Sequence, residues 1–588
     1  MIDPEITGDP HSEIKEKVDF WHSRMESQLT RFNSMANFWR ILKPSRNADF
    51  SGFANPQVTE TTRAVEAIAT FFYRAMTSAQ PNFQFLSNNP NVTPEQLWCS
   101  ERTVEWQLTA TNYRRKLLKA CRSLGLFGTV AIEQPWTTNM PYYESTDFIP
   151  RSLIQMAFDP LSFDISLSPW HASIDYITEE QLRALGKNNP DVWDQQAIED
   201  AISASSEAKN LSPELTARMA AAGYNSFAGN GSNFTSRIFQ LIIYYGPLKN
   251  DVTRSEWCVA TINDLKTIKA HRSDYRRRPF AFAHMNEFEM EPYAYGVGRL
   301  AESMQPEINS NRGRMHDVIT FALFNQWLAD RNANIKPSQM RIKPWGVIEV
   351  DGNVETALKA VRPQIEAVNF GLQMENMLKT EFRSTSGASD SLQAIVTQAT
   401  ATESSLAQNE SVRRLSVMAE VASEVLLREH ISKMHENNLT FLDQPFSIAV
   451  TGQQQSLRIF PSSLAIDVQV QTKIVTDKDF RPQRNKDLLQ FMQIASSMAQ
   501  QNPQMGKVNM EPFVSEFARA VGMNPKNVWQ AIPPMPGLIA PPQNAPQGAP
   551  MPNAMQRMAQ LQQQSESMRG KAGELGAESH NMAMAGVQ

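Results

Sequence analysis

Three cysteines in 588 residues leave little room for disulfide chemistry. Cys99, Cys121 and Cys258 form no C-x-x-C pair, so the sequence encodes neither a disulfide framework nor a zinc knuckle. No apolar run reaches the roughly 18 residues that a membrane span needs, and residues 1–5 lack the basic and apolar layout of a signal peptide. We therefore expect a protein that is made in a reducing cytoplasm and does not enter a membrane.

A strong basic excess is missing as well. The 56 Lys and Arg residues are outnumbered by 61 Asp and Glu residues, which gives a formal net charge of −5. Proteins that hold DNA tightly through its phosphates usually carry a large positive charge, because phosphate neutralisation supplies that affinity. If DNA is a partner, we expect it to be held loosely or by local patches, as a sliding conduit requires.

Motifs of nucleotide and acyl chemistry are absent too. The sequence has no G-x-x-x-x-G-K-[ST] run, which argues against an ATP-driven motor, and no G-x-S-x-G. Residues 229–231 and 296–298 carry only a G-x-G, which is typical of plain turns. His430 and His435 are five residues apart on a predicted helix, where we expect two partly exposed side chains on different faces and not a metal site. The sequence predicts no catalytic residue, no metal and no cofactor.

What the sequence does contain is a set of long amphipathic helices. Apolar residues recur every three or four positions over residues 14–39, and again over residues 65–76. A third helix is predicted over residues 94–126 and is closed by Gly128. These patterns indicate helices with one buried face each.

The following region mixes strands with short helices. Residues 129–132 and 239–245 have β-like composition. A strand over residues 174–177 should lead into a helix, because Thr178 can cap it while Gln181 sits at the third helical position. We expect a mixed α+β region here.

The most informative stretch is residues 296–437. A helix of about 30 residues is predicted from Gly296 onward, a short β insert ends at Gly352, and a return helix spans residues 354–382. Two such helices joined by a small insert would leave their apolar stripes uncovered in a lone subunit. Neighbouring copies arranged in a ring can cover them.

The C-terminal part has a different character. Residues 384–391 are rich in Ser, Thr, Gly and Ala, a composition suited to a mobile loop, and the longest helical pattern covers residues 398–437. After these come a strand at 466–470, helices at about 484–502 and 510–521, and a Pro/Gln/Met-rich tail from residue 533 that we expect to be mostly disordered.

Two basic runs stand out on this acidic chain. One lies in the β insert, before the next acid, Glu349, and consists of Arg331, Lys336, Arg341 and Lys343. It suggests contact with an acidic partner or with DNA phosphate, and a solvated hairpin end is the alternative. The other is residues 276–278, for which a solvated turn and a DNA or partner contact are the two interpretations.

The order of these elements, together with several local runs, resembles the portal proteins of phages, and in particular the head-to-tail connector family of short-tailed phages. Residues 279–280 (PF) followed by 293–299 (YAYGVGR) resemble the start of the family's first stem helix. Residues 400–403 (TATE) resemble the start of its long helix, 125–129 (GLFGT) its helix-to-strand step, and 174–185 its wing segment. The resemblance is spread over most of the chain.

The resemblance implies an α+β, mainly helical subunit of portal type, with wing, stem, clip and crown regions that form a ring. Its regions would be the N-terminal helices and wing (1–298), first stem helix (299–330), clip (331–352), second stem helix (353–383), tunnel loop (384–397), long helix and wing return strands (398–480), crown helices (481–530) and a disordered tail (531–588). Pro306 and Pro363, inside the two stem helices, depart from the family pattern.

The resemblance also implies a function that involves no enzymatic step. About twelve copies would form a channel at one capsid vertex, through which double-stranded DNA is packaged and ejected. The clip would dock the terminase large subunit and later the tail adaptor or nozzle proteins, and the ring would contact the major capsid and scaffolding proteins. We expect the protein in the virion, and in the host cytoplasm during assembly, without a membrane partner.

Candidate site residues follow from the same resemblance. Candidates for contact with DNA in the channel are Arg312, Arg314, Lys359, Arg362, Ser384, Thr385, Ser386, Ser389 and Ser391. Candidates for partner binding at the clip are Arg331, Lys336, Arg341 and Lys343. Hydroxyl-bearing residues at a constriction suit weak hydrogen bonds to phosphate without a charge trap.

Two other functions remain open. A minor head or adaptor protein without a DNA channel is one, although adaptors are usually much shorter. A nucleic-acid enzyme such as a terminase or nuclease is the other, but it would need a phosphate-binding loop or a clustered acidic metal site, and the sequence shows neither.

Overall fold

The computed structural model describes only part of the chain. The described residues are 10–42, 53–78, 82–139, 143–188, 190, 192–204, 213–221, 237–249, 251, 255–263, 266–323, 326–329, 353, 358–361, 366–388, 413–448 and 457–472. The chain divides into two units, Met1–Ser497 and Met498–Gln588, and all of the described residues belong to the first. The predicted helices beyond residue 480 and the predicted disordered tail therefore lie outside the described residues.

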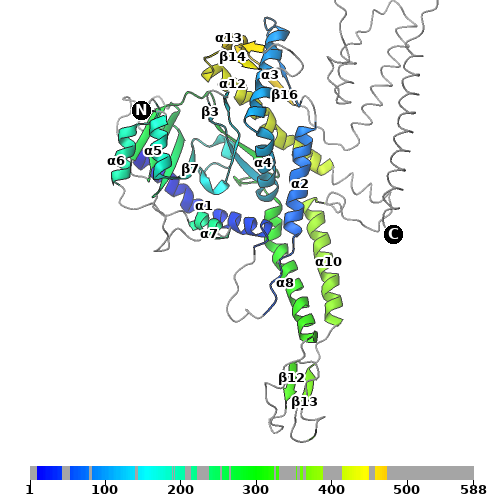
Figure 1. Ribbon diagram of the computed structural model, residues 1–588. Coiled ribbons are helices and arrows are strands. Elements are labelled where there is room, and N and C mark those ends of the chain that lie inside the picture. Colours follow the sequence, from blue (N-terminus) through cyan, green and yellow to red (C-terminus); the bar gives the residue numbers. More distant parts are fainter. Residues whose placement is uncertain are drawn as a thin grey trace, which may run out of the picture. The chain divides into compact units, whose positions relative to one another are not determined.

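The first two predicted helices are confirmed. Helix α1 spans His11–Trp39 and α2 spans Glu60–Thr77 (Figure 1). The predicted stripe of α1, from Ile14 to Met35, is buried, and so is that of α2, from Val65 to Met76. Both stripes enter one large apolar core together with strands of the body.

The prediction of one continuous helix over residues 94–126 is wrong. Residues 94–126 form two helices, α3 (Pro94–Ala110) and α4 (Tyr113–Phe127). Asn112 separates them with a left-handed backbone at φ 55°. Asparagine tolerates this conformation better than most residues, and it interrupts the helical ladder. Gly128 closes α4 as predicted, at φ 81°.

A five-stranded antiparallel sheet forms the mixed region. Its strands lie in the order β10 (Lys266–Arg272), β9 (Trp257–Ile262), β8 (Ile238–Gly246), β7 (His171–Thr178) and β6 (Met156–Phe158). Helix α5 (Glu179–Asn188) follows β7, and the predicted cap is present: the Thr178 and Gln181 side chains each accept the other's backbone N–H. Helices α5 and α6 (Gln195–Ala204) share an apolar cluster with this sheet.

Smaller ladders complete the β structure. A three-stranded sheet has the order β11 (Phe280–His284), β2 (Thr129–Glu133) and β5 (Ile149–Arg151). The pairs are β1 (Phe83–Leu86) with β16 (Gln469–Thr472), β3 (Trp136–Asn139) with β4 (Tyr143–Thr146), and β14 (Phe446–Ile448) with β15 (Leu457–Ile459). The remaining short elements are the 3-10 turns Leu153–Gln155 and Ile165–Leu167, α7 (Pro213–Ala221) and α13 (Pro461–Leu464).

The long C-terminal helix is present from residue 413, the first described one. Residues 413–423 are α-helical, Glu424–Glu429 form a π-helical segment, and α12 continues over His430–Phe441. The Tyr113 hydroxyl donates to the Leu426 carbonyl at 2.7 Å, inside the π-helical segment. Residues 398–412 of the predicted helix lie outside the described residues.

The expectation of partly exposed histidines on this helix is wrong. His430 is fully buried, stacked on Tyr113 and edge-on to Phe148, and His435 is buried beside Phe85. Burial lowers the pKa of His430 to about 3, so the ring is neutral in the core. The prediction erred because the stripe of this helix is wide enough to bury polar rings that can stack on aromatic neighbours.

Two helices and a short two-stranded ladder form the first part of the stretch 296–437. Helix α8 spans Val297–Leu323 and α10 spans Glu366–Ser386, and the two pack along each other (Figure 1). Strands β12 (Gln326–Ala329) and β13 (Leu358–Val361) pair beyond the end of α8. The two predicted helices are thus present, and residues 331–352 of the predicted insert lie outside the described residues.

The boundaries differ from the predicted ones. The return helix begins at Glu366 instead of residue 354, because residues 358–361 form a strand and Pro363 disfavours a helix before it. The first helix ends at Leu323, before the predicted 330. The return helix also runs to Ser386, so the first residues assigned to the loop 384–397 are helical.

The start of α8 rests on the end of α4 through backbone contact. A Cβ added at Gly296 would lie 2.3 Å from the Gly128 nitrogen and 2.5 Å from the Leu126 carbonyl oxygen. One added at Gly298 would lie 2.6 Å from the same oxygen. Two of the sequence runs that carry the family resemblance, residues 125–129 and 293–299, therefore meet here, and only glycine allows the approach.

Replacing Gly296 with alanine should destabilise the fold. The added methyl group meets backbone atoms that cannot rotate away, so we expect a loss of about 3 kcal/mol in the free energy of unfolding. Chemical denaturation measures it. Gly125→Ala is the matched control, because its nearest neighbours would lie at 3.6 Å and the site is helical. A Gly296→Ala protein as stable as this control would contradict the close packing.

Candidate functional site

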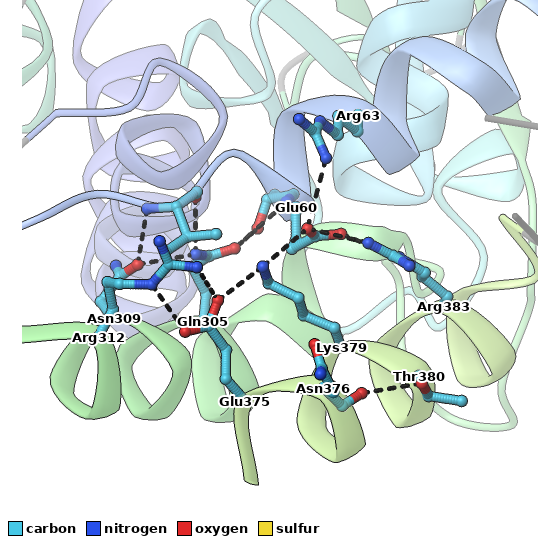
Figure 2. Close-up of polar contacts among 12 residues, drawn as sticks. Glu60, Arg63, Gln305, Asn309, Arg312, Glu375, Asn376, Lys379, Thr380 and Arg383 are labelled. Carbon is cyan, nitrogen blue, oxygen red and sulfur yellow. Dashed lines mark hydrogen bonds and ion pairs between the residues drawn. The ribbon is translucent and has the colours of Figure 1, made fainter. Parts of the chain in front are cut away.

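A polar face lies at the base of the α8–α10 pair. On α8 it consists of Gln305, Asn309 and Arg312, whose spacing of four and three residues places them on one side of the helix. On α10 it consists of Glu375, Lys379 and Arg383, again four residues apart. Figure 2 shows both rows pointing toward the beginning of α2. Three elements that are far apart in sequence therefore meet in one polar junction.

The two amides of α8 hold the chain that leads into α2. Gln305 accepts hydrogen bonds from the backbone N–H of Thr61 at 3.2 Å and from its hydroxyl at 2.7 Å, and donates to the Val58 carbonyl at 2.8 Å. Asn309 accepts from the Val58 N–H at 2.9 Å and donates to the Gln57 side chain at 2.8 Å. Each amide uses both its donor and its acceptor, so this segment is fixed on α8.

Two buried carboxylates form the centre of the junction. Glu60, in the first turn of α2, is 1% exposed, and Glu375 on α10 is 2% exposed. Arg383 donates to both oxygens of Glu60, at 3.1 and 3.2 Å. Lys379 lies 2.6 Å from Glu375 and 3.8 Å from Glu60, so it joins the two acids.

Arg312 completes the cluster from α8. Its guanidinium binds Glu375 in a two-pronged arrangement, with Nε donating to Oε2 at 2.7 Å and Nη2 donating to Oε1 (Figure 2). Such a fork is stronger and more directional than a single ion pair. Arg63, at 3.7 Å from Glu60, adds a more exposed cation. The junction therefore places four cations around two acids.

The ionisation of the cluster follows from these contacts. Burial would raise the pKa of Glu375, but hydrogen bonds from Arg312 and Lys379 outweigh it, so the pKa of this carboxyl is lowered. The hydrogen bond to Glu375 raises the pKa of Arg312 in turn. Both groups are charged at neutral pH. The arrangement can lock three helices together, but nothing in it supplies a nucleophile or a proton-transfer pair.

The far halves of the two helices carry exposed apolar side chains. Met315 of α8 lies against Gly371 of α10, and Met315, Leu378 and Phe382 are buried. Outside that contact, the exposed apolar side chains are Ile319, Phe321 and Leu323 on α8 and Phe370, Leu372 and Met377 on α10. Leu323 and Phe370 are each 70% exposed. We call these six residues the outer stem surface. Of the stripe predicted for α8, Ile319 and Leu323 are exposed, whereas Ile308 and Met315 are buried within the subunit. The prediction that this stripe is left uncovered is therefore wrong for the first part of α8.

The predicted channel cations have different surroundings. Arg312 is engaged with Glu375, as described above. Arg314 is exposed and has no ion-pair partner among the described residues. Lys359 lies on β13, where only the backbone is described, and Arg362 lies outside the described residues. The four basic residues predicted for the clip, Arg331, Lys336, Arg341 and Lys343, also lie outside them.

The predicted channel hydroxyls are partly described. Ser384, Thr385 and Ser386 lie in the last turn of α10. Their hydroxyls donate to carbonyls of their own helix, Ser384 and Thr385 to Glu381 and Ser386 to Arg383. Ser389 and Ser391 lie outside the described residues.

Two of the three arginines in the basic run 276–278 form ion pairs within the chain. Arg277 forms an ion pair with Glu436 at 2.7 Å, and Arg278 forms one with Glu256 at 2.7 Å. Arg278 also donates to the Ser168 and Pro169 carbonyls. Arg277 thus connects the run to α12, and Arg278 connects it to the residue before β9. Most of the run therefore has a structural role in the subunit.

Sequence reasoning missed Glu60 and Glu375. The spacing of Glu375, Lys379 and Arg383 was visible as a charged face of a helix, but charged faces are usually solvated. The partner acid, Glu60, is 323 residues from Arg383 along the chain. No local pattern can join residues so distant.

Other kinds of site find little support in the described part of the chain. No group of three or more His, Cys, Asp or Glu side chains there could hold a metal ion. Among the described helices, none is long and apolar enough to cross a membrane.

Comparison with known protein families finds a match to part of the chain. The family model of the phage SU10 portal protein matches residues 312–569, which include the end of α8, all of α10 and the long helix after it. The match confirms the resemblance to portal proteins that the sequence motifs indicated, and supports a bacteriophage portal protein. None of the curated proteins matches the chain.

The buried cluster predicts a pH-dependent loss of stability on removing one acid. Glu375→Gln leaves Arg312 and Lys379 without their shared carboxylate, so we expect a loss of about 3 kcal/mol at pH 7. The contribution of Glu375 is complete above its unfolded pKa, about 4.3, and disappears as pH falls through its lowered folded pKa. The difference between wild type and variant should therefore shrink toward pH 3.

Urea denaturation at several pH values tests this. Glu105→Gln is the control, since Glu105 makes an exposed ion pair with Arg102 and should contribute less than about 1 kcal/mol. A Glu375→Gln effect no larger than that of Glu105→Gln, or one independent of pH, would contradict the structural role of the cluster.

Proposed function

We propose that this chain, for which the family match supports a bacteriophage portal protein, forms a ring at one vertex of the capsid through which double-stranded DNA is packaged and ejected. The portal assignment rests on the match over residues 312–569. The ring, the channel and the docking of other proteins are our inferences from the residues and the fold.

The outer stem surface is the observation that carries this proposal. Six large apolar side chains are exposed on two helices that already pack along each other. Apolar side chains gathered in this way mark interaction sites, because leaving them in water is costly. The polar junction at the base fixes both helices, so they present this surface in a defined geometry instead of folding it away.

A ring explains why the surface is shared by two helices. In a two-fold dimer, one patch meets the same patch of the partner, whereas in a ring two different patches meet head to tail. The α8 side offers Ile319 and Leu323, four residues apart, and the α10 side offers Phe370 and Met377, seven apart. We propose that the α8 part of one copy contacts the α10 part of the next. The family resemblance gives a ring of about twelve copies.

The docking of other proteins is proposed from sequence alone. Residues 331–352, which lie between β12 and β13 in the sequence, carry the four basic residues of the predicted clip. We propose that they receive the terminase large subunit during packaging and tail adaptor or nozzle proteins afterwards. The major capsid and scaffolding proteins would surround the ring, placing the protein in the virion after assembly in the host cytoplasm.

The proposed contacts with DNA are unequal in strength. Arg314 keeps a free charge among the described residues and is our candidate from α8, while the charge of Arg312 is largely compensated by Glu375. The hydroxyls at the end of α10 already donate their protons to a carbonyl of their own helix, so they can donate to phosphate only weakly. Weak contacts suit DNA that must slide.

Changing the outer stem surface should prevent ring assembly. In a Leu323→Ser/Phe370→Ser protein, each interface between copies is deprived of two apolar side chains worth roughly 1.5–3 kcal/mol each, which weakens it about a hundredfold or more. Mass photometry should show wild-type rings of about 800 kDa from the 66.3-kDa chain and variant monomers.

The monomer itself should be unaffected, because both side chains are exposed, and its thermal unfolding should match that of the wild type. Leu161→Ser is the control: Leu161 is 72% exposed and lies in the loop after β6, away from the stem. Rings of normal mass in the double variant, or wild-type protein that stays monomeric at micromolar concentration, would refute the proposal.

A further inference from the structure

Helix α4 has an unusual charge composition. Its fifteen residues, Tyr113–Phe127, include five cations and no acid. The chain as a whole has a net charge of −5, so this concentration of positive charge is local. The inner face of the helix is apolar and buried, with Leu117, Cys121 and Leu124 in the core. The cations therefore occupy the rest of a rigidly held helix.

Two of the five cations have partners in the subunit. Lys116 forms an ion pair with Asp147, and Arg122 forms one with Glu66 on α2 at 3.0 Å. The other three, Arg114, Arg115 and Lys119, are exposed. None of the three has an ion-pair partner among the residues that the structure describes. We call these three residues the α4 cation group.

The α4 cation group does not serve the stability of the helix. Arg114 and Arg115 lie in the first turn, where the positive end of the helix dipole repels cations by several tenths of a kcal/mol each. Arg115 and Lys119 are four residues apart on one face, a spacing at which like charges destabilise a helix by a similar amount. The Asn112 side chain makes no compensating cap. Such a costly arrangement points to a role outside the subunit.

The surface around these cations fits nucleic acid better than protein. Protein interfaces have an apolar centre, yet no large apolar side chain is exposed on α2 or α4, although such side chains are exposed on α8 and α10. Protein–DNA interfaces are polar and strongly positive. Arginine and lysine contact phosphate oxygens, and such contacts carry no sequence information directly.

We infer that the α4 cation group binds the phosphate backbone of double-stranded DNA independently of sequence. Arg115 and Lys119 would contact phosphates along one face of α4, with Arg114 beside them at its first turn. The inference rests on the proposed function in that DNA is the polyanion a portal meets. Three contacts per copy give only a modest affinity, which permits DNA to move past.

The salt dependence of DNA binding tests this inference. The full chain is titrated into a fluorescently labelled 30-bp duplex, and anisotropy is followed between about 50 and 200 mM salt. In Arg114→Gln/Arg115→Gln/Lys119→Gln, the slope of log K against log salt should fall in magnitude by about 0.9 for each phosphate that the variant no longer neutralises. Duplexes of unrelated sequence should give the same result. An unchanged slope overturns the inference.

A matched control removes the same charge elsewhere. Lys15, Arg24 and Lys187 are also exposed and have no ion-pair partner among the described residues, so changing all three to glutamine should leave the slope close to that of the wild type. Arg114→Lys/Arg115→Lys retains the charge and should retain the slope. Equal slopes in the α4 variant and the control would show a general effect of net charge and would overturn the inference.

Two further measurements separate the outcomes. Mass photometry reports ring assembly in the same samples, so a failure of the proposed ring is distinguished from a failure of the α4 contact. An oligo-glutamate peptide replaces the duplex in a parallel titration. Tighter binding of that peptide than of DNA at equal salt, abolished in the α4 variant, would assign the surface to an acidic protein and overturn the inference.

Discussion

Two carboxylates that cannot reach water determine how this subunit is built around α8 and α10. Glu60 and Glu375 are almost completely buried, and a buried charge is tolerated only when cations and hydrogen bonds replace its hydration. The cations come from both helices, while Glu60 comes from the start of α2. Separating any of the three elements would leave an unpaired charge in a dry environment.

Such a cluster specifies geometry more than it adds stability. An apolar junction of equal volume would often be as stable, because it carries no desolvation cost. It would, however, allow the helices to slide or rotate, since apolar contact is not directional. The two-pronged contact of Arg312 and the paired amides of Gln305 and Asn309 have directions and lengths. In the ring that we propose, the two helices would need this fixed orientation, because a ring closes only at one angle between subunits.

The sequence correctly predicted features that depend on neighbouring residues. It did not predict features that depend on a residue far away in the chain. The stripe of α1, the cap at Thr178 and the helix end at Gly128 depend on neighbours within a few positions, and all are confirmed. The break at Asn112 was missed because its cost is small and tertiary contacts select it. The strand at 358–361 was missed because its partner, residues 326–329, lies across an insert. Glu60 was missed for the same reason, since Lys379 and Arg383 are more than 300 residues away.

The partners of the arginines show why a charged residue in a sequence is hard to interpret before the fold is known. Arg312 and Arg277 stand in plausible places for contact with DNA, yet buried or half-buried acids already neutralise them. The run at the start of α4 was not singled out, although its lack of acids was visible, because a charged helix face is most often merely solvated. What distinguishes the two cases is the partner across space. A cation paired inside the subunit fixes the fold, and a cation left without one remains able to bind an anion from outside. On a chain with a net charge of −5, a few such residues can guide a polyanion without holding it.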